Sequence, residues 1–242
     1  NIKMNEDETS GVPIGSIENP DVDARSSLDN ENKSISSYEV FEQCIIRAEN
    51  LVSLHDSTEE IEAVSDEHYC DCYRAAVVLT ISALDAFLRK AIISEIRKVL
   101  SDTDKTVNEE LSNYVKKLLN QDKLLDAARR HDLLDQVEGA VKDDFETKSF
   151  QGEWKIETYL KLVGYKNIFS EVSVKADINE NNLRGKLNVY TKRRHVIAHS
   201  GDYDLNQTPH KENNIQKDYA KDCIDTVRLF ARTIHEVMEN TR

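Results

Sequence analysis

Residues 190–202 read Tyr-Thr-Lys-Arg-Arg-His-Val-Ile-Ala-His-Ser-Gly-Asp. Apolar side chains recur in and before this stretch at steps of three, four and seven, namely Leu183, Leu187, Tyr190 and Ile197. This spacing predicts an amphipathic helix over residues 181–199 that ends at Gly201. Arg194 lies on the apolar stripe of that helix. Because a guanidinium keeps its charge and is costly to bury alone, Arg194 needs a carboxylate partner or an anionic ligand.

The same helix is rich in positive charge. Five cations and no acid lie between residues 184 and 194: Arg184, Lys186, Lys192, Arg193 and Arg194. The whole chain has a formal net charge of −13, which argues against a nucleic-acid-binding protein with a basic surface throughout. A local cationic cleft on an acidic protein is instead the asymmetry expected of a narrow phosphate-binding site.

The composition favours an all-α fold. The 242 residues include only seven glycines and three prolines, and turn-rich β architectures need more of both. The prolines, Pro13, Pro20 and Pro209, all lie outside the periodic segments. A hydrophobic content of 39% and a charged content of 32% are ordinary for a soluble globular protein.

Three other segments carry strong helical periodicity: residues 37–55, 66–100 and 215–238. The second is apolar over most of its circumference between Ala75 and Ile93, so we predict that it is the central helix of a bundle. Asp85 lies on an inward stripe of this helix, together with Arg74. We expect Asp85 to pair with Arg194, since an arginine–carboxylate pair would neutralise both charges.

The remaining segments define the predicted domain organisation. Residues 1–35 hold eight acids and three cations and have no usable period, which predicts a flexible acidic tail. Residues 36–242 are predicted to form a single helical domain, within which residues 101–180 are a helical insertion covering one side of the bundle. Helices are expected there at 107–119, 121–130, 132–146 and 154–163, followed by an irregular segment from 163 to 182.

The cysteines and the hydropathy pattern indicate the compartment. Cys44, Cys70, Cys72 and Cys223 are scattered and resemble buried apolar residues more than a disulfide framework, so we expect a reducing, cytoplasmic location. The longest apolar run, residues 75–88, is interrupted by polar residues and cannot span a membrane. No secretory signal is visible at the N-terminus.

The sequence Arg194-His-Val-Ile-Ala-His199-Ser-Gly201 resembles the signature of the HEPN superfamily, in which four to six residues separate an arginine from a histidine and a polar residue directly follows the arginine. An aliphatic helix with an inward acid, here Asp85, precedes the motif, and a long amphipathic helix follows it. The resemblance covers residues 37–100 and 181–240. It implies an up-and-down helical bundle that dimerises, with two motif copies across one cleft. Many members are metal-independent endoribonucleases of antiviral defence and toxin systems.

The resemblance implies roles for individual residues. His199 would be a general base or acid, because an imidazole exchanges protons near neutral pH. Arg194 would stabilise the transition state, because its planar fork binds two phosphate oxygens. His195 would orient substrate or the catalytic imidazole, and Asp85 would position Arg194. The cations Lys192, Arg193, Lys186 and Arg184 would bind flanking phosphates of the RNA. The expected products are a 2′,3′-cyclic phosphate and a 5′-hydroxyl, formed without a metal or another cofactor.

Other interpretations of these residues remain open. Arg194 could be a purely structural partner of Asp85, and a histidine near a helix C-terminus is favoured by the helix dipole without any catalytic role. Lys192 and Arg193, taken without the motif, are ordinary surface cations. Arg228 and His235 repeat the bare spacing in the last helix, where a histidine at the edge of the core is expected.

Two groups of residues have spacings that metal ligands also show. His195 and His199 have the i, i+4 spacing of zinc ligands, but Val196 stands where a zinc protease needs its glutamate. His68, Cys70 and Cys72 cannot all converge at the start of a helix, and a structural role is favoured.

The partners expected from this sequence are RNA and a second copy of the chain, and no membrane. A toxic nuclease also needs restraint by an inhibitory partner or by an upstream sensor domain; the sequence does not begin with methionine, which leaves room for such a domain. The competing functional hypothesis is a catalytically silent HEPN-like module that dimerises or binds RNA within a larger effector, because a fold does not require activity.

Overall fold

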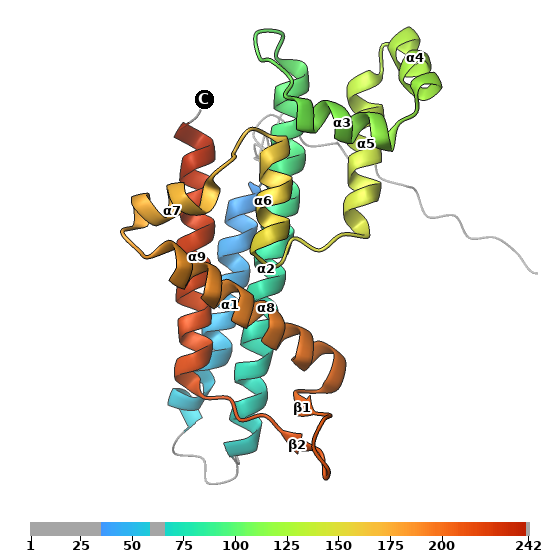
Figure 1. Ribbon diagram of the computed structural model, residues 1–242. Helices are drawn as coiled ribbons and strands as arrows, with labels where there is room; N and C mark the ends of the chain where they lie inside the picture. The colour runs from blue at the N-terminus through green and yellow to red at the C-terminus, as the bar shows by residue number, and fades with distance from the viewer. Residues whose placement is uncertain (1–34, 59–65, 241–242) are drawn as a thin grey trace, which may run out of the picture. The chain divides into compact units, whose positions relative to one another are not determined.

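A computed structural model describes residues 35–58 and 66–240 (Figure 1). The predicted acidic tail, residues 1–35, falls almost wholly outside the described residues. From Ile35 onward the chain forms one compact unit. Its described part is almost entirely helical, as predicted, with helix α1 at Ser37–Thr58, α2 at Asp66–Ser101 and α9 at Lys217–Asn240 as its longest helices.

These three helices pack along one another and form the centre of the bundle. Each buries the apolar stripe that its sequence period predicts. On α9 the buried stripe comprises Cys223, Val227, Phe230 and Ile234. On α1 it comprises Phe41, Ile45, Ala48 and Val52.

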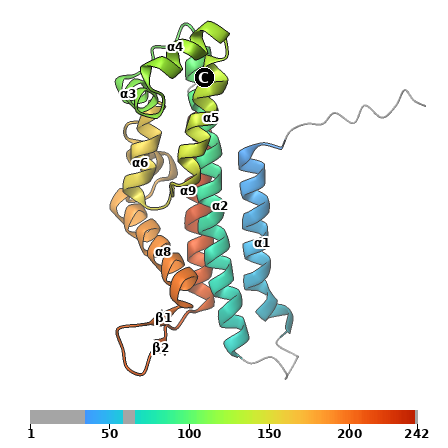
Figure 2. The same ribbon diagram turned by 90° about the vertical axis from the view of Figure 1, so that its right-hand side faces the viewer.

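Helix α2 is central because it is apolar on several sides. It packs against α1 and α9, and also against α5 at Leu133–Glu146, α6 at Glu153–Leu162 and α8 at Glu180–Ser200. Ile81, Leu88 and Ile92 along it have no exposed surface. Figure 2 shows α1 and α8 on opposite sides of α2, so the helix separates the α1 side of the bundle from the motif side.

The middle segment forms a series of short helices, and their bounds agree closely with those predicted. They are α3 at Glu109–Leu118, α4 at Gln121–Arg130, α5 at Leu133–Glu146 and α6 at Glu153–Leu162. Helices α5 and α6 pack against α2, whereas α4 packs on α5. Figures 1 and 2 both place α3, α4 and α5 at the end of α2 that is remote from the β-strands.

The predicted irregular segment 163–182 is partly wrong, because it contains helix α7, Ile168–Ala176. This helix is short and rich in β-branched residues, which have modest helix propensity. Tertiary packing stabilises it instead. Its Ile168, Phe169 and Val172 are buried, and the Phe169 ring stacks on Phe230 of α9 with centroids 5.1 Å apart.

Helix α8, Glu180–Ser200, carries the predicted motif. Its first turn is capped by Asn179, whose side chain accepts a hydrogen bond from the Asn182 backbone N–H. It ends at Gly201, which has a left-handed φ of 60° that glycine adopts without strain. A two-stranded hairpin follows, with β1 at Tyr203–Asp204 antiparallel to β2 at Lys211–Glu212.

The described cysteines are all free thiols, and Cys223 is buried. Among the helices described, none is both long and apolar enough to cross a membrane.

Candidate active site at the end of helix α8

The last turn of α8 is anchored by Asp202, which directly follows the terminal glycine. Asp202 is completely buried and has a left-handed φ of 68°, a conformation that aspartate tolerates better than most residues. Its backbone carbonyl accepts hydrogen bonds from the backbone N–H and the side-chain amide of Asn213, at 2.9 and 2.7 Å. These bonds tie the start of the hairpin to its end.

The Asp202 carboxylate binds two arginines from different helices. Its Oδ2 atom accepts hydrogen bonds from Arg74 Nε of α2 at 2.9 Å and from Arg193 Nη2 of α8 at 2.6 Å. Arg74 is also buried and reaches the Asn213 carbonyl, Asp71 and Glu212. Burial alone would lower the pKa of Arg74, but the bonds to Asp202 and Asp71 raise it above its usual value. We call Arg74, Asp202, Arg193 and Asn213 the Asp202 cluster.

Arg193 therefore has a structural role. Besides Asp202, its Nη2 atom donates to the carbonyls of Asn213 and Asn214, at 3.2 and 3.0 Å. Its guanidinium also lies over the Tyr219 ring, 5.9 Å from the centroid. The Arg193 guanidinium is already bound to Asp202 through Nη2, although its buried Nε has no partner among the described residues, so the structure gives no support to the prediction that Arg193 holds a flanking phosphate.

Arg194 lies in a different environment, although it is the next residue. It is half-buried, and no described residue forms an ion pair or a hydrogen bond with its side chain. Its Nε atom is buried and lacks a partner. An unpaired buried donor on a charged group is costly, so an anion that supplied the missing bonds would be stabilised there.

The two motif histidines lie together. His195 and His199 are both exposed, and their ring centroids are 4.3 Å apart with an angle of 46° between the ring planes. This confirms the prediction that His195 shares the side of the helix on which His199 lies. Lys192, one turn before His195, is also exposed and has no ion-pair partner among the described residues.

The predicted pairing of Asp85 with Arg194 is wrong. The Asp85 carboxylate accepts hydrogen bonds from Arg89, one turn further along α2, at 2.8 Å and from the Phe150 backbone N–H at 2.6 Å. Arg89 in turn donates to the Phe145 and Lys148 carbonyls. Asp85 thus fixes the segment between α5 and α6 against α2, and the acid next to the motif is Asp202.

Two of the other predicted phosphate-binding cations also have carboxylate partners. Arg184 Nη2 contacts Glu157 at 2.5 Å and Glu180 at 2.8 Å, its Nη1 contacts Glu153 at 3.3 Å, and its guanidinium lies 4.2 Å from the Phe169 ring centroid. Lys186 bonds Asp222 of α9 at 2.5 Å. Both residues therefore join α8 to its neighbours, and of the five predicted α8 cations only Lys192 and Arg194 lack an ion pair within the described residues.

The second match to the bare motif spacing has a structural explanation. Arg228 makes a bidentate pair with Glu49 of α1, at 2.6 and 2.7 Å. The His235 ring stacks on Tyr38 with centroids 4.4 Å apart. Both side chains join α9 to α1, which supports the motif copy at Arg194 as the candidate site.

The alternative metal sites gain no geometric support. Nowhere in the described residues do three or more His, Cys, Asp or Glu side chains gather as metal ligands. Cys70 donates to the Ile215 carbonyl at 3.6 Å, a contact that suits a structural role.

Sequence reasoning missed Asp202 and its two arginines as a cluster. Arg74 and Asp202 are separated by 128 positions, so no local pattern connects them. Two signals were available: Arg74 occupies an inward stripe of α2, and Asp202 follows the glycine that ends α8. Neither signal shows that Arg74 and Asp202 bind one another.

The comparison with known families agrees with this geometry. A family model described as RiboL-PSP-HEPN matches residues 42–240. The chain belongs to the HEPN family. The match runs through residues 101–180, for which the motif resemblance had no counterpart. Neither the curated proteins nor the solved structures gave a match.

Membership of the HEPN family confirms the predicted fold class, a HEPN-type helical bundle. It also supports a nuclease or RNA-related role in general terms, since HEPN domains commonly bind RNA and dimerise and are typically ribonucleases.

Proposed function

We propose that this HEPN protein is a metal-independent endoribonuclease whose active site is formed by Arg194, His199 and His195. An imidazole of His199 takes the proton of a ribose 2′-hydroxyl, and the 2′ oxygen attacks the adjacent phosphorus. The bond from phosphorus to the 5′ oxygen then breaks, and that oxygen receives a proton from an imidazolium. The products are a 2′,3′-cyclic phosphate and a 5′-hydroxyl, and no net proton is consumed.

Arg194 stabilises the phosphorane in this mechanism. The crowded intermediate carries extra negative charge on its non-bridging oxygens, and a guanidinium donates two parallel hydrogen bonds to such oxygens. The observation that carries the proposal is that Arg194 has no hydrogen-bond or ion-pair partner among the described residues, whereas its neighbour Arg193 has several. An arginine that served the fold alone would be expected to bind a carboxylate, as Arg193 does.

The active site is composite and needs two subunits. The five-residue step from Arg194 to His199 places their side chains about 140° apart around the helix axis. One phosphate therefore contacts both most readily when Arg194 comes from one subunit and His199 from the other. HEPN domains commonly dimerise, which is consistent with this arrangement.

The primary test is cleavage of a mixed RNA pool by the purified protein in EDTA. The expected result is cutting that EDTA does not suppress, with cyclic-phosphate and 5′-hydroxyl ends, and its loss in His199→Ala. Exposed Lys221→Ala on α9 is a matched surface control that should cut normally. RNA binding and dimerisation without any cutting would instead favour a silent HEPN-like module of a larger effector.

A second test addresses the composite site. Arg194→Ala and His199→Ala proteins are each inactive, but mixing them creates heterodimers with one intact pair of residues. Random exchange in a symmetric dimer should restore about one quarter of wild-type activity. If both residues act within one subunit, the mixture stays inactive.

The proposed activity also suggests a biological role. A nuclease that cuts cellular RNA harms its host, which suits a role in antiviral defence or in a toxin system. Such a protein would be held inactive by an inhibitory partner or an attached sensor domain. The formal net charge of −13 repels bulk RNA and restricts binding to a local site.

A further inference from the structure

Trp154, in the first turn of α6, is the only tryptophan of the chain and is 71% exposed. Single exposed apolar side chains are common on proteins and need no explanation by themselves. Trp154 differs because of the charges around it and because of the helix on which its first turn docks.

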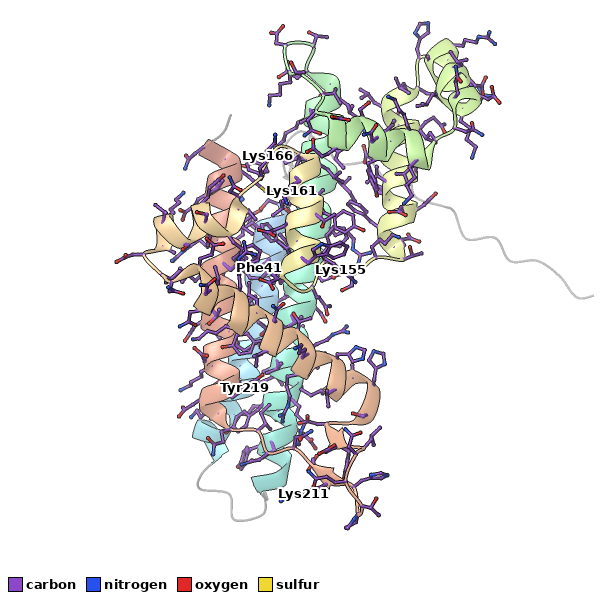
Figure 3. All side chains as sticks on the ribbon, in the orientation of Figure 1. Phe41, Lys155, Lys161, Lys166, Lys211 and Tyr219 are labelled. Atoms are coloured by element: carbon purple, nitrogen blue, oxygen red, sulfur yellow. The ribbon has the colours of Figure 1, made fainter. Side chains whose placement is uncertain are left out.

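The acidic side chains of α6 are bound from inside the molecule. Glu153 and Glu157 share Arg184 of α8, which also binds Glu180. The lysines of the same region have no such partner: within the described residues Lys155, Lys161 and Lys166 make no ion pair. Figure 3 places Lys155 at the end of α6 nearest α8, and Lys161 and Lys166 towards its other end. These three ammonium groups therefore remain available to an anionic ligand.

The first turn of α6 docks on the face of α8 that carries the motif. The Asn188 side chain accepts a hydrogen bond from the Glu153 backbone N–H at 3.3 Å and donates to the Glu153 carboxylate at 2.9 Å. From Asn188, steps of four, seven and eleven lead to Lys192, His195 and His199, which lie on the same side of the helix. The axial distances from Asn188 to His195 and His199 are about 10 and 16 Å. Trp154, next to Glu153, thus lies at the start of this line.

We propose that Trp154 is a base-stacking subsite for single-stranded RNA. A base that flanks the cleavage site stacks on the indole, while Lys155 and Lys192 bind the phosphates on either side of it. Aromatic side chains next to lysines are the usual means of holding single-stranded nucleic acid without sequence preference. This subsite deepens the proposed ribonuclease function and rests on it, since it assumes that the α8 motif receives RNA.

The charges favour RNA over a second copy of the chain as the occupant. In a two-fold dimer centred on this surface, Lys155, Lys161 and Lys166 would face the same three lysines of the second copy, and like charges brought together oppose association. A polyanion such as RNA is instead attracted by every lysine that lacks an ion pair. Binding by RNA should therefore weaken as salt concentration rises.

The test uses the fluorescence of the single tryptophan in the full-length His199→Ala protein, which binds RNA without cutting it. Titration with a labelled single-stranded RNA oligonucleotide should quench Trp154 emission at the same concentrations at which the anisotropy of the RNA label rises. In a His199→Ala background, Trp154→Ala should weaken RNA binding about 5- to 100-fold, and Trp154→Phe should retain most of the affinity. Val174→Ala is the matched control, because Val174 is 81% exposed on α7 and should leave affinity unchanged.

Several outcomes would overturn the subsite. RNA that binds without quenching and with equal affinity for Trp154→Ala does not stack on the indole, and an absence of RNA binding removes the subsite altogether. A Trp154→Ala protein that loses its dimeric mass would assign the indole to the subunit interface. Quenching and weakened binding in a wild-type protein that cuts no RNA would support the subsite while contradicting the nuclease proposal.

Discussion

Two sets of residues in the last turns of α8 differ sharply in how their polar groups are satisfied. In the Asp202 cluster, Arg193 shares the buried Asp202 carboxylate with Arg74 and bonds two hairpin carbonyls. Among the motif residues, half-buried Arg194 has no partner within the described chain, and His195 and His199 are exposed next to one another. The charges of the Asp202 cluster stabilise the fold, whereas the motif residues are available to a ligand.

This difference explains how a cationic helix can serve both stability and function. Arg184, Lys186 and Arg193 are neutralised by acids of α6, α9 and the hairpin, so they hold α8 in position. Lys192 and Arg194 remain unpaired within the described part of the chain. Without these internal acids, the half-buried arginines of α8 would lack a counter-charge, which is costly inside a protein.

The largest expected effect is on the Asp202 cluster. Asp202→Ala leaves two arginines without their carboxylate, one of them buried, and should lower the free energy of unfolding by about 3–5 kcal/mol. Urea denaturation measures this loss. Asp204→Ala in the same hairpin, where the carboxylate accepts hydrogen bonds from Asn206 and Gln207, should cost less than about 1 kcal/mol. Equal losses of unfolding free energy at both positions would contradict a special structural role for the buried Asp202 carboxylate.

A smaller effect should separate the two neighbouring arginines. Arg193→Ala removes charged hydrogen bonds from the Asp202 cluster and should cost about 1.5–3 kcal/mol in unfolding free energy. Arg194→Ala should change the same quantity by less than about 0.5 kcal/mol, because its guanidinium forms no hydrogen bond or ion pair with a described residue. Thermal and urea unfolding of both variants checks the difference. A loss in Arg194→Ala that matches the loss in Arg193→Ala would show that Arg194 is structural.

The smallest effect concerns the contact of Lys186 with Asp222. Burial alone would raise the pKa of Asp222, but hydrogen bonds from Lys186 and Tyr190 bring it below its usual value. A carboxylate with a lowered folded-state pKa adds stability above its unfolded-state pKa, and this contribution is lost as the pH falls below about 4. Because Asp222 is partly exposed, we expect about 0.5 kcal/mol or less.

The corresponding measurement is the free energy of unfolding between pH 6 and pH 3, for wild type and Asp222→Asn. The variant should show a slightly shallower loss of stability in acid. Parallel curves would mean that the pair contributes nothing to the docking of α8.

The sequence predicted the long helices because their stabilising contacts are periodic. The apolar stripes of α1, α2 and α9 are visible as steps of three and four, and each stripe is buried. Helix α7 was missed because its nine residues have weak intrinsic preference and depend on packing, such as that of Phe169 on Phe230. The hairpin after α8 was missed because its two short strands are set by Asp202 and Asn213 rather than by alternation.

Only part of the candidate site could be predicted, because only that part depends on helical periodicity. The positions of Arg194, His195 and His199 follow from helical spacing, which the sequence shows directly. Their electrostatic partners do not, because ion pairs join residues that are distant in the chain. Asp85 was assigned to Arg194 on the basis of its inward position, but Arg89 one turn away was the nearer cation.

The most direct measurement of the proposed division of roles is the RNA cleavage rate of Arg194→Ala beside wild type, in EDTA, on protein whose unfolding free energy and dimeric mass have been measured. We predict a rate lower by about 100- to 1000-fold, as for the loss of a transition-state hydrogen-bond donor, with stability and dimerisation unchanged. Wild-type cleavage by a folded Arg194→Ala dimer would contradict it and would leave the unpaired guanidinium without a catalytic role.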